Sequence, residues 1–460
     1  MQKRSILLLI SLFVYLIFVS PILFEWNDIV QACGVLIIAQ ILWVGGVFPF
    51  PFSALIIMLI VSFHFFRFEE TLGFLGSDVV WLLFSTYIIS GAFLESGLAY
   101  RISLYALRLS KGSGKLLLFV LMLLILILSV FIPSNIGRGN LIVSVLNNIA
   151  THFTKMGKAK NISKALFIAG SHVVTIGGAA VVTGANSTIY AFSMFNDTST
   201  SEISYLMWML LFTPPMIIFI VVLWLVLLLI FPLESVNSRE IMNYIEGKIV
   251  QIGSVKRSEL KMIILISFIV LLWILQPYHG YSISMIAMLG AVLTMLPLIG
   301  IWEWKQAKDN VNWGMLLFFA STLIVSHLLI RTETLDFFAK AFIEYVPFNN
   351  SFMILFILVV LTVLLRSLFV SILGYMTLMI PFAIVIGKHV DGIPSLTIAM
   401  AVFLAGVPAF FFVTQSPVHI IFYSYGYFTK KDLFYSGSIV VFIWIVIVLS
   451  TVYFYWSYLL

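Results

Sequence analysis

Two stretches of small and polar residues interrupt long apolar runs, and they hold the side chains best suited to binding small ions. The first, residues 132–140, reads I-P-S-N-I-G-R-G-N and offers Ser134, Asn135 and Arg138. An arginine presents a permanently charged, planar fork that suits a carboxylate or a sulfate. The sequence shows no paired carboxylates in one stretch, no Ser-His-Asp arrangement and no metal-ligand spacing. These residue types favour recognition of ions over covalent catalysis, so we expect neither an enzyme nor a cofactor.

The second stretch, residues 177–188, reads G-G-A-A-V-V-T-G-A-N-S-T. Pro133 in the first stretch and the glycines in both predict that a helix is broken at each place. Unpaired backbone groups are costly in hydrocarbon, so a break at membrane depth lies inside protein or beside a watery cavity. A single break is equally well explained as a loop between two spans. Paired breaks are typical of transporters with internal repeats.

Each polar residue in or near these stretches has a structural alternative to a role in binding. Arg138 either faces an anion or extends its charged end to the edge of the membrane. Ser134 and Asn135 either bind an ion or cap the helix that follows, and the two roles are compatible because a helix N-terminus attracts anions. His172 and His419 are either proton carriers or neutral side chains satisfied between helices.

The composition is that of a membrane protein. Of the 460 residues, 62% are hydrophobic and only 10% are charged, too few charges to cover a soluble protein of this size. About 11 apolar runs are long enough to span a bilayer. We therefore expect an all-α, multi-pass protein of the cell membrane, surrounded by lipid. The net charge of +6 does not imply a nucleic acid, and the single cysteine, Cys33, excludes an intrachain disulfide.

Lysine and arginine concentrate in four segments, and this excess predicts which segments stay in the cytoplasm. The segments are the N-terminus, Arg101 to Lys115, Lys155 to Lys164 and Leu233 to Lys261. The apolar run from Ser5 to Phe24 is too long for a signal peptide and lacks a cleavage site, so we interpret it as a first span with its N-terminus inside. The chain between the second and third segments leaves and returns on one side, which predicts a re-entrant hairpin with Ser134 and Asn135 at its tip.

The second half of the chain repeats the order of the first. The tetrapeptide N-V-N-W at 310–313 matches D-V-V-W at 78–81, residues 366–371 match the first stretch, and residues 413–419 match the second. We divide the chain into a first transmembrane repeat, 1–232, a cytoplasmic linker, 233–261, and a second transmembrane repeat, 262–460. If each half has an odd number of spans, the repeats are inverted and their breaks meet near the midplane.

At these positions the chain resembles the divalent-anion/sodium symporter family, part of the ion transporter superfamily. Residues 133–138, P-S-N-I-G-R, are similar to the family's P-S-N-T-A-R, and residues 176–178 with Gly184 are similar to I-G-G-T-x-x-x-I-G-T-P-P-N. Residues 416–419 and 425–429 resemble T-P-P-N-A-I-V-F-G-S-G-Y-F-T. The resemblance implies two inverted repeats, each with a re-entrant hairpin and a broken helix, in a homodimer with an elevator-like motion. It also implies transport of dicarboxylates, citrate or sulfate, usually with sodium.

The family's S-N-T triplet supplies ligands for substrate and cation in each half, and here it reads Ser134-Asn135-Ile136 and Ser371-Ile372-Leu373. Hard cations prefer oxygen ligands, so the apolar residues of the second triplet predict weakened sodium coupling, with a proton or an exchanged anion as the driver. His419 stands where the family has an asparagine. The substrate-binding candidates are Ser134, Asn135, Arg138, Ser371, Ser416 and His419. The cation-binding candidates are Ser134, Asn135, Gly184, Asn186 and Thr188.

The sequence thus predicts a secondary active transporter of small anions, either di- and tricarboxylates or sulfate-like ions, with Na⁺ as the candidate coupling ion. Two alternatives stay open. One is a membrane-embedded enzyme of envelope polysaccharide assembly, which a large charged extracellular loop would favour. The other is a relative that has lost transport and serves as a sensor or scaffold, an interpretation supported by the altered second triplet.

Overall fold

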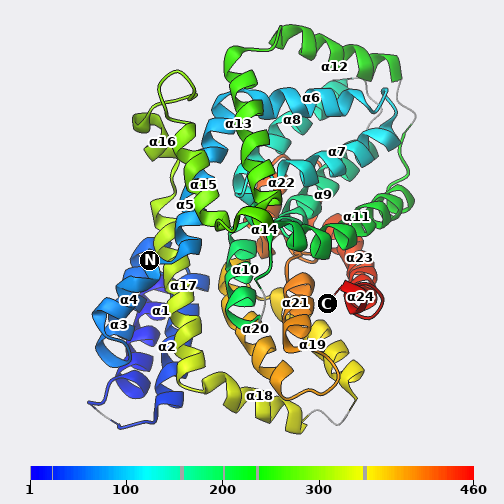
Figure 1. Cartoon of the computed structure of the whole chain (residues 1–460). Helices are drawn as coiled ribbons and strands as arrows, with labels where there is room; N and C mark the ends of the chain where they lie inside the picture. The colour runs from blue at the N-terminus through cyan, green and yellow to red at the C-terminus, as the bar shows by residue number, and fades with distance from the viewer. Residues whose placement is uncertain are drawn as a thin grey trace. The chain divides into compact units, whose positions relative to one another are not determined.

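The computed structural model describes residues 2–22, 24–155, 160–199, 202–234, 238–345 and 350–459, with the backbone only for residues 2, 3 and 152–155. Every regular element among these residues is a helix (Figure 1). The all-α fold expected from the composition is confirmed. Lys158 of the third basic segment lies outside the described residues, as do residues 235–237 of the linker and the side chain of Lys155.

The helices follow one order twice. The first series is α2 (Asp28–Val44), α3 (Phe50–His64), α4 (Phe68–Gly73), α5 (Asp78–Glu95), α6 (Leu98–Arg108), α7 (Gly114–Leu128), α8 (Asn135–Lys155), α9 (Lys160–Gly177), η3 (Val182–Gly184), α10 (Asn186–Thr198) and α11 (Tyr205–Ile230). The second is α13 (Arg257–Ile274), α15 (Ile283–Leu293), α16 (Trp304–Asn310), α17 (Trp313–Arg331), α18 (Thr334–Tyr345), α19 (Ser351–Arg366), α20 (Ile372–Lys388), α21 (Ser395–Gly406), η4 (Val413–Gln415), α22 (Pro417–Ser424) and α23 (Lys430–Ser450).

The remaining elements lie outside this repeating order. They are α1 (Gln2–Val14), η1 (Tyr15–Val19), η2 (Phe74–Gly76), α12 (Ser238–Ile252), α14 (Gln276–His279), η5 (Thr451–Trp456) and α24 (Ser457–Leu459). The order of elements agrees with an internal repeat, while the repeat boundaries at 232 and 262 and the inversion of the repeats stay predictions.

Four breaks separate helices at or next to the predicted stretches. The first predicted stretch is only partly broken, because α8 begins at Asn135 and residues 135–140, with both glycines, are helical. We name them the first hairpin break (129–134), the first broken segment (178–185), the second hairpin break (367–371) and the second broken segment (407–416). The apolar run before the first break extends to Phe131, but α7 ends at Leu128. The chain leaves the helix in a turn that the Ile132 N–H closes on the Leu128 carbonyl, at 3.0 Å. Pro133 follows and has no N–H with which to continue the helix.

Two compact units share the chain, and each takes segments from both halves of the sequence. Unit 1 comprises Met1–Phe84, Tyr190–Glu202 and Asn312–Gly406. Within it α3 packs on α17, and α20 packs on both α17 and α21. Gly406 permits the close approach of α21 to α20, because a Cβ there would lie 2.9 Å from the Tyr375 ring and from Met376 Cε.

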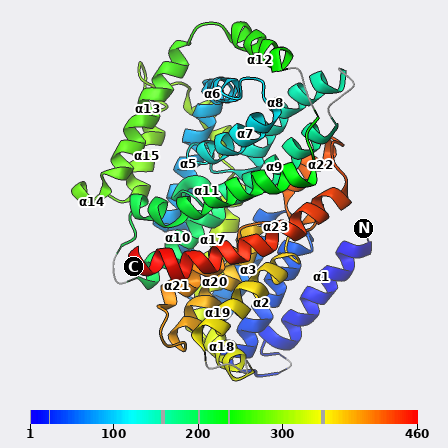
Figure 2. The ribbon, with the colours of Figure 1, turned by 90° about the vertical axis from the view of Figure 1, so that its right-hand side faces the viewer.

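Unit 2 comprises Ser85–Ile189, Ile203–Val311 and Val407–Leu460. Its central helix is α9, which packs against α7, α8, α11 and α22, and every residue from Ala165 to Gly177 is buried. Helices α11 and α23 run alongside each other (Figure 2). This unit contains three of the four breaks, so it positions most of the predicted site residues.

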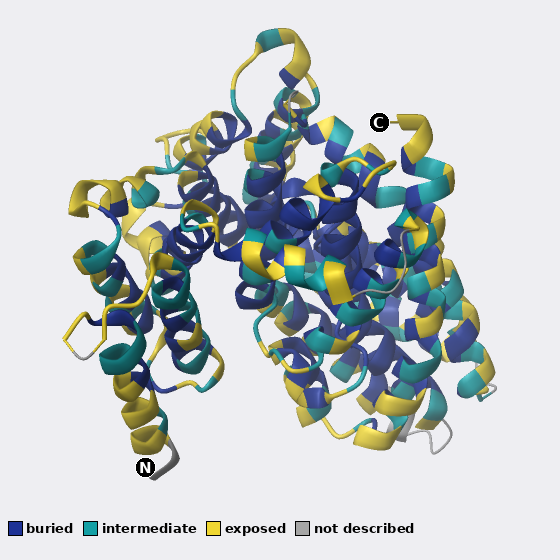
Figure 3. Ribbon diagram, turned by 90° about the horizontal axis from the view of Figure 1, so that it is seen from below, coloured by how far each residue is buried: buried dark blue, intermediate teal, exposed yellow. Residues whose placement is uncertain are grey.

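Apolar helices with exposed apolar faces agree with a membrane protein. Within the described ranges, four helical stretches are long and apolar enough to cross a membrane, namely Asp78–Glu95, Tyr205–Ile230, Trp313–Arg331 and Lys430–Leu459, and further apolar helices are shorter. Large apolar side chains such as Leu229 and Phe442 are 80% and 71% exposed. Figure 3 shows such exposed residues interspersed with buried ones along the helices. Exposed apolar surface on this scale requires lipid rather than water.

The predicted linker is largely helical. Helix α12 packs on α6 and buries Ile241 and Ile245. Arg101 of α6 is buried and donates to Glu259 at 2.8 Å and to the carbonyls of Gly253 and Ser254 at 3.0 and 2.9 Å. These contacts fix the end of the linker to α6. The cytoplasmic position of the linker and of the N-terminus stays a prediction.

Candidate anion and cation site

Arg138 is the centre of the predicted site in unit 2. Ser134 caps α8 by accepting from the Gly137 N–H at 3.1 Å, so the first turn of this helix carries both Asn135 and Arg138. The Arg138 side chain is completely buried. Its charge therefore depends on partners inside the protein, because an unpaired buried charge is costly.

The Arg138 guanidinium connects the first hairpin break to the first broken segment. One terminal nitrogen donates to the carbonyls of Ile132 at 2.5 Å and Gly184 at 3.0 Å. The other donates to the Asn135 side chain at 2.7 Å and to the Val174 carbonyl at 3.0 Å. Only Nε lacks a partner among the described residues. In this arrangement the fork neutralises backbone carbonyls that a broken helix leaves without donors, and a single N–H is left for a ligand.

Side chains from α10 and α11 occupy further carbonyls of the first broken segment. Thr188 Oγ1 donates to the Gly178 carbonyl at 2.8 Å. Trp208 Nε1 donates to Ala179, and Thr213 Oγ1 donates to Ala180, both at 3.0 Å. The segment is buried throughout, and these donors supply hydrogen bonds that a continuous helix would have made.

The two ends of the first broken segment approach each other closely at glycines. A Cβ on Gly184 would lie 2.4 Å from the Gly178 carbonyl oxygen. A Cβ on Gly178 would lie 2.8 Å from the Ala185 Cβ and 3.1 Å from an Arg138 nitrogen. Glycine is therefore required at both positions for steric reasons, whichever ion the site binds.

The predicted cation ligands of the first half lie in this same region. Ser134, Asn135 and Gly184 are joined through Arg138 and α8, and Thr188 closes the segment as described above. The Asn186 side chain donates to the Tyr87 hydroxyl at 3.1 Å. These residues thus lie on the first hairpin break, the first broken segment and the helices that follow them, and each already takes part in a hydrogen bond. A carbonyl oxygen has two lone pairs, so each keeps some capacity for a cation.

The second broken segment is held by different side chains. Gln415 Oε1 accepts from the N–H groups of Phe411 and Phe412, at 3.0 and 3.4 Å. Ser416 caps α22 by accepting from the Val418 N–H at 3.2 Å. The ring of His419 contacts the Phe412 carbonyl at 3.3 Å, and it is completely buried.

Helix α22 lies against both α8 and α9, so unit 2 brings Ser416 and His419 to the helices that carry the first-half candidates. Close packing at Gly170 of α9 makes the contact with α9 possible, because a Cβ there would lie 2.4 Å from the Phe422 ring. At Gly139 of α8 a Cβ would lie 3.6 Å from Val418, an ordinary contact. Within unit 2, the helix that follows the second broken segment thus lies beside the two helices that flank the breaks of the first half.

Ser371 belongs to unit 1, where it repeats the role of Ser134. It caps α20 by accepting from the Gly374 N–H at 3.2 Å. Arg366 ends α19 and is 1% exposed, and its terminal nitrogen donates to the Phe369 carbonyl within the second hairpin break. Each hairpin break therefore has a serine cap after it and a buried arginine on one of its carbonyls.

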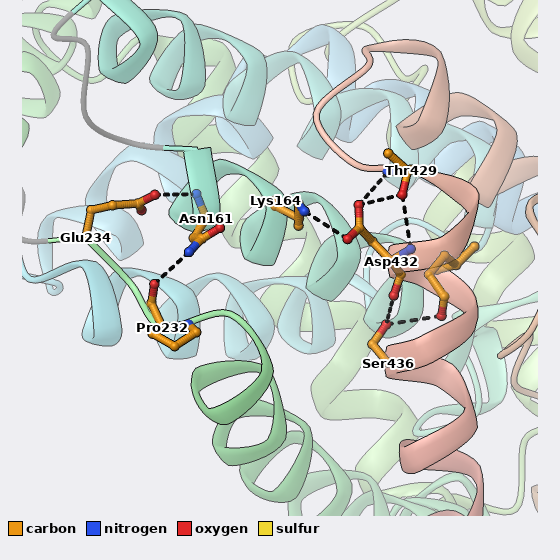
Figure 4. Close-up of polar contacts among 8 residues, drawn as sticks. Asn161, Lys164, Pro232, Glu234, Thr429, Asp432 and Ser436 are labelled. Carbon is orange, nitrogen blue, oxygen red and sulfur yellow. Dashed lines mark hydrogen bonds and ion pairs between the residues drawn. The ribbon is translucent and has the colours of Figure 1, made fainter.

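A basic cavity of 570 Å³ borders the second broken segment and is lined by Phe411, Phe412, Val413, Thr414, Lys430, Lys431, Phe434 and Tyr435. Its volume lies within the range of about 300–1,000 Å³ that is typical of small-molecule sites. The neighbouring acid, Asp432, accepts from Lys164 at 2.8 Å and from the Thr429 N–H and hydroxyl (Figure 4). Because its carboxylate is already paired, it leaves the two lysine charges in the cavity largely uncompensated.

Several residues of the site were not singled out from the sequence. Trp208 and Thr213 lie in an apolar helix, and nothing in that helix marks which side chains reach a carbonyl of another segment. Gln415 directly precedes Ser416, a predicted site residue. Lys430 and Lys431 directly follow Thr429, the last residue of the second family pattern. A search for polar residues adjacent to each break would have found these.

The family model for the sodium:sulfate symporter transmembrane region matches residues 1–460. The chain belongs to this family. The resemblance seen in the broken stretches is therefore confirmed, and since family and relatives are transporters, the protein is not an enzyme. The alternative of a polysaccharide assembly enzyme is thereby excluded.

Two transporters named as antiporters are similar to this chain at low identity. The citrate/succinate antiporter of Escherichia coli K12 is 24% identical over 372 residues, covering 79% of this chain and 75% of that protein. The L-tartrate/succinate antiporter of Shigella sonnei is 23% identical over 387 residues, covering 82% and 78%. Among solved structures, the YdaH transporter of Alcanivorax borkumensis matches with a TM-score of 0.55 and 12% identity, covering 99% of this chain and 97% of that one. This likeness supports the fold alone.

Proposed function

We propose that the protein is a secondary transporter of small di- and tricarboxylates that works by exchanging one carboxylate for another. Relatives over most of the chain are named as citrate/succinate and tartrate/succinate antiporters. The observation that carries the proposal is the basic cavity beside the second broken segment, whose two lysines suit an anion with two carboxylates.

The candidate ligands have separate roles in this proposal. The N-terminus of α8, with Ser134 and Asn135, and that of α22, with Ser416, attract the carboxylates. Arg138 positions the first of these ends rather than gripping the substrate with its whole fork, because its terminal nitrogens serve carbonyls and Asn135. Ser371 contributes from the second hairpin, as the family pattern implies.

For the driving ion we propose one sodium site at most, at the first broken segment. Oxygens of Ser134, Asn135, Gly184, Asn186 and Thr188 supply it, together with carbonyls of the break. The second triplet offers a side-chain oxygen only from Ser371. We further propose the homodimer with cytoplasmic N-termini that the family resemblance implies.

The test is exchange of radiolabelled succinate in proteoliposomes loaded with unlabelled succinate, citrate or sulfate. We expect exchange with the two carboxylates, no stimulation by internal sulfate, and a sodium dependence with a Hill coefficient near one. A Hill coefficient well above one would show that a second cation site survives. Absence of exchange in a folded protein under every condition would support the non-transporting relative instead.

The role of the basic cavity is tested by comparing two double variants. Lys430→Gln with Lys431→Gln should raise the KM for succinate about tenfold, because two positive charges near an anion are lost. Lys305→Gln with Lys308→Gln on α16 removes the same charge from exposed positions outside the cavity and serves as the control. Equal KM values for the two double variants would remove the cavity from the path of the substrate.

A further inference from the structure

Two buried histidines, on two different helices, contact backbone carbonyls of the second broken segment. His172 of α9 contacts the Ala409 carbonyl through Nδ1 at 3.2 Å, and His419 of α22 contacts the Phe412 carbonyl through Nδ1 at 3.3 Å. Both side chains are completely buried. Their rings meet edge to face, with centroids 5.4 Å apart.

The contacts assign the tautomer of each ring. A carbonyl oxygen only accepts, so in each neutral imidazole Nδ1 carries the hydrogen and Nε2 carries the lone pair. For His172 this Nε2 has no hydrogen-bond partner among the described residues. This lone pair is the position at which the ring can bind a proton.

The charged and titratable residues around the two histidines come from the neighbouring helices. Arg138 on α8 is a permanent cation on a neighbouring helix, and its terminal nitrogens donate to four acceptors, among them the Val174 carbonyl of α9. The segment between Val407 and Ser416 itself carries no titratable side chain. On α9, on α22 and on the elements that pack around them and the segment, the other titratable groups with described side chains are Lys115, Lys160, Lys164, Tyr205, Tyr423, Lys430, Lys431, Asp432, Tyr435 and Tyr453.

Three of these groups have partners of their own. Lys164 and Asp432 pair with each other, and Tyr205 contacts Thr183. His172 contacts the Ala409 carbonyl and pairs with no carboxylate among the described residues, and His419 contacts the Phe412 carbonyl.

We propose that His172 and His419 form a binding site for a single proton at the second broken segment. The proton adds to the lone pair of His172 Nε2 and forms an N–H bond, so the ring becomes a cation that still donates from Nδ1 to Ala409. A charged donor makes the stronger hydrogen bond, so the bound proton tightens the hold on the segment. A second proton on His419 is opposed, because it would place two like charges on adjacent buried rings.

This inference rests on the proposed function in one respect, namely that the proton takes part in carboxylate exchange. In that role the proton supplies the positive charge that the second half no longer obtains from a sodium ion with oxygen ligands. Because the segment lies beside the basic cavity, its hold on Ala409 and Phe412 affects the path of the substrate. Exchange should therefore depend on pH in the range where histidine titrates.

The direct test is NMR of the full-length protein in detergent, labelled with ¹⁵N-histidine. We expect one signal with Nδ1–H character that gains a proton between about pH 8 and about pH 5.5, the range of histidine titration, and that is absent from His172→Gln. His279→Gln is the matched control, because both ring nitrogens of His279 are already used, by the Leu272 carbonyl at 2.8 Å and the Tyr281 N–H at 3.0 Å. A His172 signal that stays neutral over the whole range would overturn the proposal.

The functional arm is succinate exchange at the same pH values. The wild type and His279→Gln should change rate about tenfold across the range, whereas His172→Gln, which keeps a side-chain N–H for Ala409, should change less than about twofold. An unchanged pH profile in His172→Gln would refute the role in exchange. Failure of the wild type to exchange succinate at any pH would refute the proposed function instead, and the NMR titration would still decide the proton site.

Discussion

The two broken segments of unit 2 solve the same structural problem with different chemistry. Both contain backbone carbonyls that a helix would have satisfied. In the first broken segment the donors are Arg138, Thr188, Trp208 and Thr213. In the second the donors are His172 and His419.

The difference between these donor sets separates a permanent from an adjustable hold. Arginine stays charged, and threonine and tryptophan stay neutral, throughout the physiological pH range, whereas histidine changes charge within it. Both segments also have a close backbone contact at a glycine, between Gly178 and Gly184 within the first segment and between Gly437 of α23 and the Phe410 carbonyl in the second. We infer that the first segment is a constant part of the site and that the second responds to protons.

The largest effect is expected from Arg138→Gln. This change removes the donors to Ile132, Gly184 and Val174 together, and hydrogen bonds to a charged group contribute about 1.5–3 kcal/mol each. We expect loss of succinate exchange and a free energy of unfolding lowered by at least about 3 kcal/mol. Thermal unfolding in detergent and exchange in proteoliposomes measure the two quantities.

Arg138→Lys separates charge from geometry in this experiment. Lysine keeps the charge but has one nitrogen, which cannot reach four acceptors. It should therefore behave much like Arg138→Gln. If Arg138→Lys restored stability and exchange, a point charge would suffice and the connection between the two breaks would be unimportant.

The positions of the breaks were predictable from sequence, but their hydrogen-bond partners were not. Pro133 and the glycines of the first broken segment mark breaks because they disfavour a helix there, whereas Gly137 and Gly139, which predict a break in the same way, lie within α8. The use of Arg138 as a clamp depends on where Val174 and Gly184 lie in space, which no local pattern encodes. For the same reason the sequence left both the anion-binding and the structural interpretation of Ser134 and Asn135 open, and the structure shows the cap directly only for Ser134.

The second prediction tests the contact between the two glycines of the first segment. Gly184→Ala would force a Cβ to 2.4 Å from the Gly178 oxygen, and such overpacking costs typically about 1–3 kcal/mol. Gly177→Ala is the matched control in the same region, since its Cβ would lie 3.7 Å from Leu126, an ordinary contact. Equal thermal stability of the two variants would mean that the first segment is looser than we infer.

The third prediction tests which ring of the second segment takes the proton. His419→Asn installs the residue of the family pattern, which keeps an N–H donor for the Phe412 carbonyl but does not titrate. Because the proposed proton adds to His172, which this variant keeps, we expect the ratio of succinate exchange rates at about pH 5.5 and about pH 8 to stay close to that of the wild type. A ratio near one would show instead that His419 takes the proton, and the assignment of the proton to His172 would be wrong.

The smallest effect is expected from Thr213→Val, which changes one neutral donor of the first segment. The substitution nearly preserves shape and removes the hydrogen bond to Ala180, a loss of about 1 kcal/mol. Thr451→Val is the control, because Thr451 donates only to Ile447 in its own helix, at 2.7 Å, and such a local bond adds little. No proton is involved at Thr213, so its destabilisation should be the same at about pH 5.5 as at about pH 8, in contrast to any destabilisation by His172→Gln. If the effect of Thr213→Val varied with pH, the first segment would also be linked to protonation, and the division between a permanent and an adjustable hold would be wrong.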